Sequence, residues 1–140
     1  MNTLLEVLFF IPHRIKLKNS DPIWTPQFRR AYKEEELLNE EALKLAKQGV
    51  IERATTSEYN SPVMVVPKKD GTWRSVIDYR NINKETIKEN WPILRTDDAI
   101  NALFKAKYIT KIDYTSGYWQ IKLDEDSKRL TAFTTKDGRW

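Results

Sequence analysis

The sequence predicts an α+β fold built on antiparallel strands, and three observations support this class. Apolar residues recur at the spacing of one helix face, at Leu38, Ala42, Leu45 and Ala46. Two Asp-Gly pairs, which favour tight hairpin turns, are each preceded by a β-prone run. Strand and helix patterns then alternate along the chain, and hairpins dominate.

The first predicted helix begins after about Tyr32. Three acidic residues, at positions 34–36, suit its positive N-terminal end, and Gly49 stands where a left-handed C-cap is expected. Before this helix we expect residues 13–17 to be extended. Pro22 and Pro26 then keep the chain irregular up to the helix.

A hairpin is predicted next, with strands over residues 63–66 and 73–79 joined through Asp70-Gly71. Alternation in its second strand puts one set of side chains on an ionic face, namely Arg74, Val76, Asp78 and Arg80. Residues 81–91 are expected to be a loop.

The remaining elements follow in order. Thr96 is expected to cap a short helix, and residues 107–113 alternate as a strand. After a break at Gly117, we expect mixed turn and strand over 118–123, a charged connection over 124–129 and a strand over 130–135. A second turn at Asp137-Gly138 follows.

Composition excludes several kinds of site. The 140 residues carry 24 Lys and Arg against 20 Asp and Glu, and this basic excess is compatible with a polyanionic partner. With no Cys and one His, thiolate chemistry and paired-His metal motifs are excluded, and four glycines cannot form a Gly-rich phosphate loop. The apolar run over residues 4–12 contains Glu6 and is too short to span a membrane, so we expect no signal peptide or anchor.

Three groups of residues are candidates for chemistry. Asp113 ends a predicted strand before a tight turn, so its carboxylate could ligate a hard cation or simply cap the turn. Lys68 and Arg74 flank a hairpin tip, where cations suit phosphate oxygens but also keep a tip soluble. Asp78 and Arg80, two residues apart, favour a structural ion pair.

Other polar and aromatic residues allow simpler readings. Aromatic residues interleave with basic ones, and such rings can stack on nucleic-acid bases or pack in a core. They are Trp24, Tyr59, Trp73, Tyr79, Trp91, Tyr118 and Trp119. Asp97 and Asp98 are explained by their place at a helix start, so we reject them as catalytic. His13 has no catalytic partners nearby in the sequence.

An ordered set of motifs resembles the reverse transcriptases of retroelements, with the Pol polyproteins of gypsy-type long-terminal-repeat retrotransposons as the best match. The resemblance rests on GVI at 49–51, SPVMVVPKKDGTWR at 61–74, DYRNIN at 78–83, WPIL at 91–94, KIDYTSGYWQI at 111–121 and TAF at 131–133. It covers residues 13–140 and implies the fingers and the first part of the palm, incomplete at the C-terminus, after an N-terminal extension of residues 1–12.

The resemblance also implies roles for single residues. Asp113 would be the first metal-binding aspartate, with the Tyr114 carbonyl in the same site. Lys68 and Arg74 would hold the triphosphate of a deoxynucleotide, and Tyr118 would exclude a ribose 2′-hydroxyl. Asp78, Arg80 and Asn83 would brace the fingers, and the template or nucleotide would lie near Asp78, Arg80 and Gln120.

The implied reaction is two-metal phosphoryl transfer with Mg²⁺, which adds deoxynucleotides to the 3′-hydroxyl of a primer on an RNA or DNA template. The other implied partner is the remainder of the polymerase domain, and the implied location is a cytoplasmic retroelement particle. The family's later motif, an aromatic residue, any residue and then Asp-Asp, does not occur in the 140 residues. Leu130 also replaces the basic residue usual before Thr-Ala-Phe, with Arg129 one position earlier.

We therefore expect a fragment that is inactive alone. Two alternatives stay open at this point. One is a non-catalytic nucleic-acid-binding module, and the other is a structural remnant with an exposed sheet edge.

Overall fold

The computed structural model describes residues 12–104 and 106–140, and its longest element is helix α1 (Tyr32–Lys47). The apolar stripe of this helix buries Leu38 and Ala42 in a cluster with Val63 and Phe133. Gly49 follows the helix with φ +72°, the left-handed conformation predicted for it. The expected first helix is therefore confirmed.

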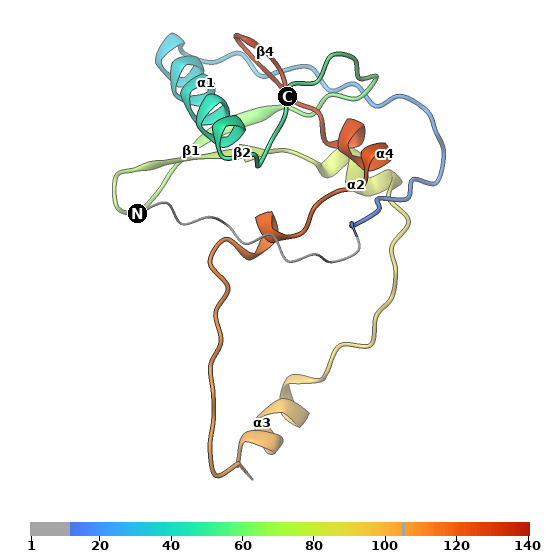
Figure 1. The fold of residues 1–140 in the computed structure, drawn as a ribbon, viewed down its shortest axis with the longest axis vertical. Helices are drawn as coiled ribbons and strands as arrows, with labels where there is room; N and C mark the ends of the chain where they lie inside the picture. Colours follow the sequence, from blue (N-terminus) through green and yellow to red (C-terminus); the bar gives the residue numbers. More distant parts are fainter. Residues whose placement is uncertain (1–11, 105) are drawn as a thin grey trace.

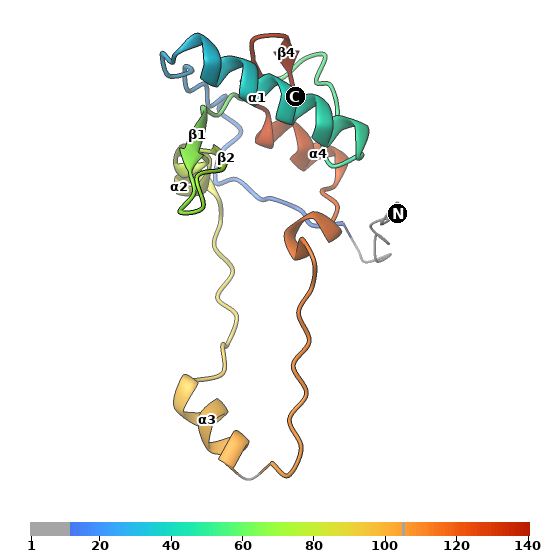
Figure 2. The same ribbon diagram turned by 90° about the vertical axis from the view of Figure 1, so that its left-hand side faces the viewer.

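Strands β1 (Val63–Pro67) and β2 (Trp73–Ile77) form the predicted antiparallel hairpin. Val63 pairs with Ile77, and these two residues face the α1 cluster. The second strand ends at Ile77 rather than at residue 79, because the chain turns there into helix α2. Figures 1 and 2 show α1 lying across this hairpin.

Helix α2 (Arg80–Glu85) corrects the first part of the loop expected over residues 81–91, whereas residues 87–91 form no helix or strand. Its asparagines have low helix propensity, but Ile82 is buried in a second cluster with Tyr59 and Leu130. Tertiary packing therefore overrides local propensity. The N-terminal segment adds Ile15 to the same cluster, and an antiparallel bridge joins Leu17 to Thr86.

The C-terminal region differs from its predicted pattern in two places. Residues 124–129 contain helix α4 (Glu125–Lys128), capped by the Asp124 carboxylate, which accepts a hydrogen bond of 2.8 Å from the Ser127 N–H. The expected strand over 130–135 begins with a 3-10 turn, η2 (Arg129–Thr131), and forms a strand only at its end, β3 (Thr134–Thr135). Leu130, Ala132 and Phe133 are all buried, so this segment enters the core instead of exposing alternate residues.

Strand β4 (Gly138–Arg139) pairs with β3 across the predicted Asp-Gly turn and brings Trp140 into the α1 cluster. The Trp140 backbone exchanges hydrogen bonds of 2.9 and 3.0 Å with Phe133. Its indole N–H donates to Thr135 Oγ1 at 2.9 Å, and the Arg53 guanidinium lies 4.5 Å from the ring centroid. Trp140 therefore anchors the β3–β4 hairpin to the α1 cluster.

Residues 92–104 and 106–121, which we call the arm, project from the rest of the molecule in both views (Figures 1 and 2). The arm contains α3 (Thr96–Phe104) and the 3-10 turn η1 (Gly117–Gln120). Thr96 is the first helical residue and not the expected cap. Within the described parts of the arm, every hydrogen bond outside its helices, every ion pair and every cation–π contact joins two arm residues.

The strand expected over residues 107–113 does not form. Ile109 and Ile112 are exposed, and no described segment pairs with this stretch. A strand needs a neighbour to satisfy its backbone, so alternation alone is insufficient. Over 118–123 the structure has η1, and Leu123 forms a bridge with His13.

The α+β class with antiparallel hairpins is confirmed, and the described residues form two separate two-stranded sheets. Among the described residues, no helix combines the length and apolar character needed to cross a membrane.

Candidate active site

The β1–β2 hairpin tip is shaped by Asp70 and Gly71. The Lys68 N–H donates to the Thr72 carbonyl at 2.7 Å, and Gly71 adopts φ +79°. The Asp70 carboxylate accepts from the Thr72 hydroxyl at 2.6 Å, and this hydrogen bond lowers the pKa of Asp70. Asp70 is therefore held by the turn and makes no ion pair with a described cation.

Lys68 and Arg74 lie on one face of this hairpin. Val66 is paired with Arg74, and Lys68 lies two residues beyond Val66, directly after the end of β1 at Pro67. Because alternate residues share a face, the two cations are diagonal neighbours, with about 7–8 Å between their backbones. The core-facing residues of β1 and β2 belong to the opposite face, so both cations are exposed to solvent.

Asp78 and Arg80 form the closest ion pair of this region. Asp78 Oδ2 accepts from Arg80 Nη2 at 2.6 Å, and Oδ1 accepts from Arg80 Nε at 2.8 Å. The contact agrees with the predicted ion pair, although Asp78 lies just after β2 and Arg80 begins α2. The hydrogen bonds from Arg80 lower the pKa of Asp78 from its ordinary value of 3.8 to about 2.

This pair gives a pH prediction. A lowered folded-state pKa means that the pair contributes full stability above the ordinary value of 3.8 and loses it as pH falls toward about 2. We expect the side-chain carboxyl carbon of Asp78 to titrate in NMR with a midpoint near 2, and Arg80→Ala to raise that midpoint toward 3.8. An unchanged midpoint in the variant would contradict the assigned cause.

Asp113 lies in the arm, in an exposed extended stretch just before η1. The predicted turn is present, and Ser116 adopts φ 52°, an uncommon conformation for a non-glycine residue. The Gln120 amide donates to the Thr115 carbonyl at 2.9 Å, so Gln120 braces the turn that follows Asp113. Tyr118 is 99% exposed.

The structure does not join the predicted site residues into one constellation. Among the described residues, Asp113, Lys68 and Arg74 share no hydrogen bond or ion pair with one another. Asn83 is exposed on α2, on the body rather than on the arm. The described chain thus presents two groups, one on the hairpin and α2 and one on the arm.

A divalent cation needs several oxygen ligands, and the described residues offer an incomplete set. Across residues 12–104 and 106–140, no group of three His, Cys, Asp or Glu side chains is placed to hold a metal ion. Asp113 supplies one carboxylate and Tyr114 one adjacent carbonyl. These donors do not by themselves fit a two-metal site.

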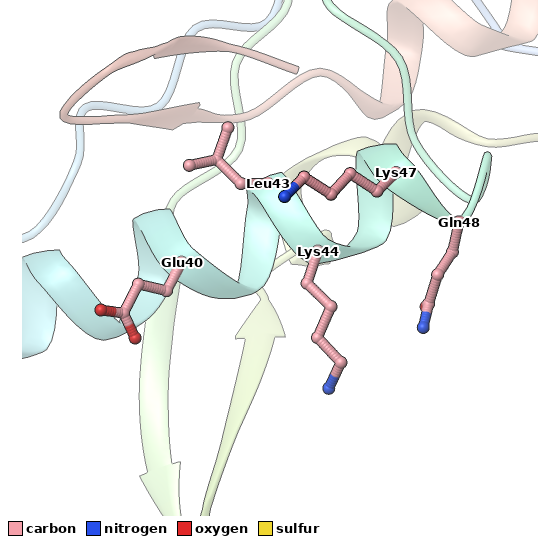
Figure 3. A pocket seen from close by; sticks show the side chains of 5 residues that line it. All are labelled: Glu40, Leu43, Lys44, Lys47 and Gln48. Carbon is pink, nitrogen blue, oxygen red and sulfur yellow. The ribbon is translucent and has the colours of Figure 1, made fainter.

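An open hollow of about 440 Å³ lies on the outer side of α1, away from all of these residues. Figure 3 shows that its side chains spread over the helix surface and do not converge, and they are Glu40, Leu43, Lys44, Lys47 and Gln48. We assign no role to it.

Comparison with known proteins identifies the family. A family model described as reverse transcriptase (RNA-dependent DNA polymerase) matches residues 66–140. The chain belongs to the reverse transcriptase family. This match includes the cationic hairpin face, the Asp78–Arg80 pair, Asp113 and Trp140.

Several relatives agree with this family. The chain is 38% identical over 133 residues to the retrovirus-related Pol polyprotein from transposon 412 of Drosophila melanogaster, covering 91% of this chain and 11% of the relative. It is 33% identical over 132 residues to the corresponding gypsy polyprotein of the same organism, covering 90% and 13%. The chain therefore spans little more than a tenth of these reverse transcriptase relatives.

Solved structures show the same fold. A Prototype Foamy Virus protease-reverse transcriptase matches with a TM-score of 0.75 and 31% identity, covering 91% of this chain and 17% of that one. A foamy viral protease-reverse transcriptase in complex with dsDNA matches with a TM-score of 0.68 and 32% identity, covering 94% and 25%.

Two features of this reverse transcriptase chain are not predicted from the sequence. Lys18, from the N-terminal segment, contacts the end of α2, where its Nζ donates to the Lys84 carbonyl at 2.5 Å. The alternation of basic residues with Ile15 and Leu17 was the available signal. The second feature is the contact of Arg53 with Trp140, for which the sequence gives no signal.

Proposed function

We propose that this chain supplies the nucleotide- and template-contacting part of an RNA-directed DNA polymerase. One observation carries the proposal. In a chain of the reverse transcriptase family, Lys68 and Arg74 share an exposed hairpin face, and neither forms an ion pair with a described acidic residue. Two cations at this spacing suit the phosphates of a deoxynucleoside triphosphate, because Lys acts as a point charge and Arg can contact two oxygens.

Other residues support parts of the same function. Asp78 fixes the Arg80 guanidinium, which would contact the template strand beside the nucleotide. Gln120 braces the turn that carries Asp113, and the exposed Tyr118 ring follows that turn, where it would exclude a 2′-hydroxyl. Asp113 and the Tyr114 carbonyl would contribute ligands to bound Mg²⁺, which supplies charge stabilisation for phosphoryl transfer.

The proposed partners follow from this function. They are a primed RNA or DNA template, deoxynucleoside triphosphates and the rest of a polymerase domain, within a cytoplasmic retroelement particle. Residues 13–140 would form part of the reverse transcriptase domain, after an extension of residues 1–12. Because the aromatic-x-Asp-Asp motif does not occur in the 140 residues, we propose that they incorporate no nucleotide alone.

Nucleotide binding by the chain itself tests the proposal. In an NMR titration with dTTP, we expect amide shifts centred on residues 66–74. Lys68→Ala should weaken binding about tenfold or more, since hydrogen bonds to charged groups contribute about 1.5–3 kcal/mol.

The neighbouring lysine provides the matched control. Lys69→Ala removes the same charge from the same hairpin but from the turn, outside the face shared with Arg74, and should change the affinity much less. Equal losses in the two variants would show a general charge effect and contradict the proposed triphosphate contact.

A further inference from the structure

Residues 13–18, which we call the N-terminal strap, cross the base of the arm between the chain that enters the arm and the chain that leaves it (Figure 2). On the entering side, an antiparallel bridge joins Leu17 to Thr86. The Lys18 N–H also donates to the Glu85 carbonyl at 2.8 Å. Because Glu85 is the last residue of α2, the strap is tied to the helix that follows the β1–β2 hairpin.

On the leaving side, the strap pairs with the chain just after η1. The His13 N–H donates to the Lys122 carbonyl at 2.8 Å, and the Asp124 N–H donates to the His13 carbonyl at 3.1 Å. The Arg14 guanidinium lies 3.5 Å from the Asp124 carboxylate. Since the chain from His13 to Leu17 can span at most about 14 Å, the strap limits how far the two sides of the arm can separate.

Ser127 is the buried residue at which the strap meets the leaving chain. It is 0% exposed, and its Oγ accepts a hydrogen bond of 2.8 Å from the Ile15 N–H. The Ser127 N–H donates to the Asp124 carboxylate that caps α4. The Ile15 side chain packs in the cluster that contains Ile82 of α2. Removing the Ser127 hydroxyl would therefore leave a strap N–H at the centre of this junction without its acceptor.

Local hydrogen bonds connect the leaving side of the strap to Asp113. The Gln120 amide donates to the Thr115 carbonyl, and the Trp119 N–H donates to the Ser116 carbonyl at 2.9 Å. These bonds form a compact turn between Asp113 and the residues that pair with the strap. On the entering side, α2 follows β2 with only a short turn between them. Each group of candidate site residues is thus joined to the strap through a braced stretch of chain.

We propose that the N-terminal strap is a positioning element that restricts where the turn beside Asp113 lies relative to the Lys68–Arg74 face, with Ser127 as its main anchor. The inference rests on the proposed function, in which both groups act on one nucleotide. Among the described residues the two groups share no hydrogen bond or ion pair, so the strap acts by holding together the two sides of the arm. Ser127 is accordingly a positioning residue that acts through Asp113.

Distances between two spin labels on the full chain test this role. The chain contains no Cys, so Lys69→Cys in the hairpin turn and Thr115→Cys beside Asp113 can be labelled specifically. The measurement is double electron–electron resonance, at a temperature at which circular dichroism shows a folded chain. We expect Ser127→Ala to raise the population of longer distances at least about fivefold, because it leaves a buried N–H unpaired.

Ser57→Ala is the matched control for this variant. Its Oγ also donates to a backbone carbonyl, that of Arg129 at 2.9 Å, and the described hydrogen bonds of Ser57 all lie outside the strap. We expect its distance distribution to match that of the unmodified chain. Equal broadening in the two serine variants would show a general loss of stability and overturn the inference.

A surface variant tests the leaving side without disturbing buried groups. Arg14 lies 3.5 Å from Asp124 and 3.6 Å from Asp126, so Arg14→Glu replaces attraction with repulsion. We expect about a twofold rise in the longer distances, in keeping with the modest strength of exposed ion pairs. Adding Asp126→Arg should reverse most of this rise, whereas Lys44→Glu on α1 should cause none.

Primer extension measures the consequence for the reaction, in a foamy viral reverse transcriptase whose corresponding segment is replaced by this chain. We expect Ser127→Ala to lower kcat, normalised to titrated active sites, at least about tenfold, since a displacement of about 1 Å can cost about 10²-fold. The KM for dTTP should change less than about twofold, because the hairpin face is intact. Loss of folded enzyme alone would leave the normalised kcat unchanged.

Unchanged label distances in Ser127→Ala, or an unchanged normalised kcat, would overturn the inference. The dTTP titration of Lys68→Ala depends on the hairpin alone and separates the two proposals. If that titration succeeds and the label distances do not change, the strap is rejected and the proposed function stands. If the titration fails while the distances change as expected, the proposed function is rejected instead.

Discussion

Asp113→Asn is expected to reduce primer extension about 10³-fold in a polymerase that contains this chain. The substitution keeps the shape of the side chain and removes the negative charge that a divalent cation requires. A bound divalent cation stabilises the transition-state charge by several kcal/mol. At about 1.36 kcal/mol per tenfold in rate, losing that stabilisation corresponds to the expected reduction of about 10³-fold. The assay is extension of a labelled primer by a foamy viral reverse transcriptase whose corresponding segment is replaced by this chain.

The unmodified chimaera and Asp98→Asn are the controls. Asp98 lies in the first turn of α3, on the same arm, and also loses one carboxylate charge. We expect it to retain near-full extension, in keeping with the rejection of Asp97 and Asp98 as catalytic. Extension by Asp113→Asn at the rate of the unmodified chimaera would reject the assignment of Asp113.

Trp140→Ala should destabilise the chain by about 3–5 kcal/mol, the usual cost of removing a buried Trp side chain. Trp140 is 6% exposed in the α1 cluster, and the variant also loses the contact with Arg53 and the hydrogen bond to Thr135. Since small domains are stable by about 5–15 kcal/mol, the loss is a large share of the total. Urea unfolding followed by far-UV circular dichroism measures it as a lower midpoint.

Trp119→Ala is the matched comparison for this experiment. Trp119 is 47% exposed and lies in the arm, outside both buried clusters, so we expect a change of less than about 1 kcal/mol. Equal midpoints for the two variants would show that the second hairpin does not depend on Trp140.

The parts of the fold that the sequence predicts well are those specified locally. The β1–β2 hairpin is fixed by the Asp70-Gly71 turn between two alternating runs, and α1 by its apolar stripe and Gly49. Helix α2 could not be predicted in this way, because its formation depends on the burial of Ile82 against residues far away in the sequence. The stretch 107–113 shows the reverse case, in which a strand pattern has no described partner.

The candidate site also contains residues that local patterns predict and residues that depend on distant contacts. Lys68, Arg74 and the Asp78–Arg80 pair could be predicted from hairpin alternation and short spacing, and the structure gives their local geometry. The relation of Asp113 to these residues depends on contacts that the described residues do not make. The contact of Lys18 with the end of α2 depends on the bridge between Leu17 and Thr86. These residues are about seventy positions apart, so no local pattern specifies the contact.

The projecting arm determines where the chain can accept insertions without losing folding stability. The described arm residues make their hydrogen bonds, ion pairs and cation–π contacts only with one another. The segments before and after the arm are therefore joined by bridges outside it, such as His13 with Leu123 and Ser61 with Phe133. The arm then acts on the stability of the body mainly as a loop whose closure costs entropy. Doubling the length of a flexible loop costs only about 0.6 kcal/mol. Insertions between α3 and η1 can therefore accumulate at little thermodynamic expense, and the body would retain its fold.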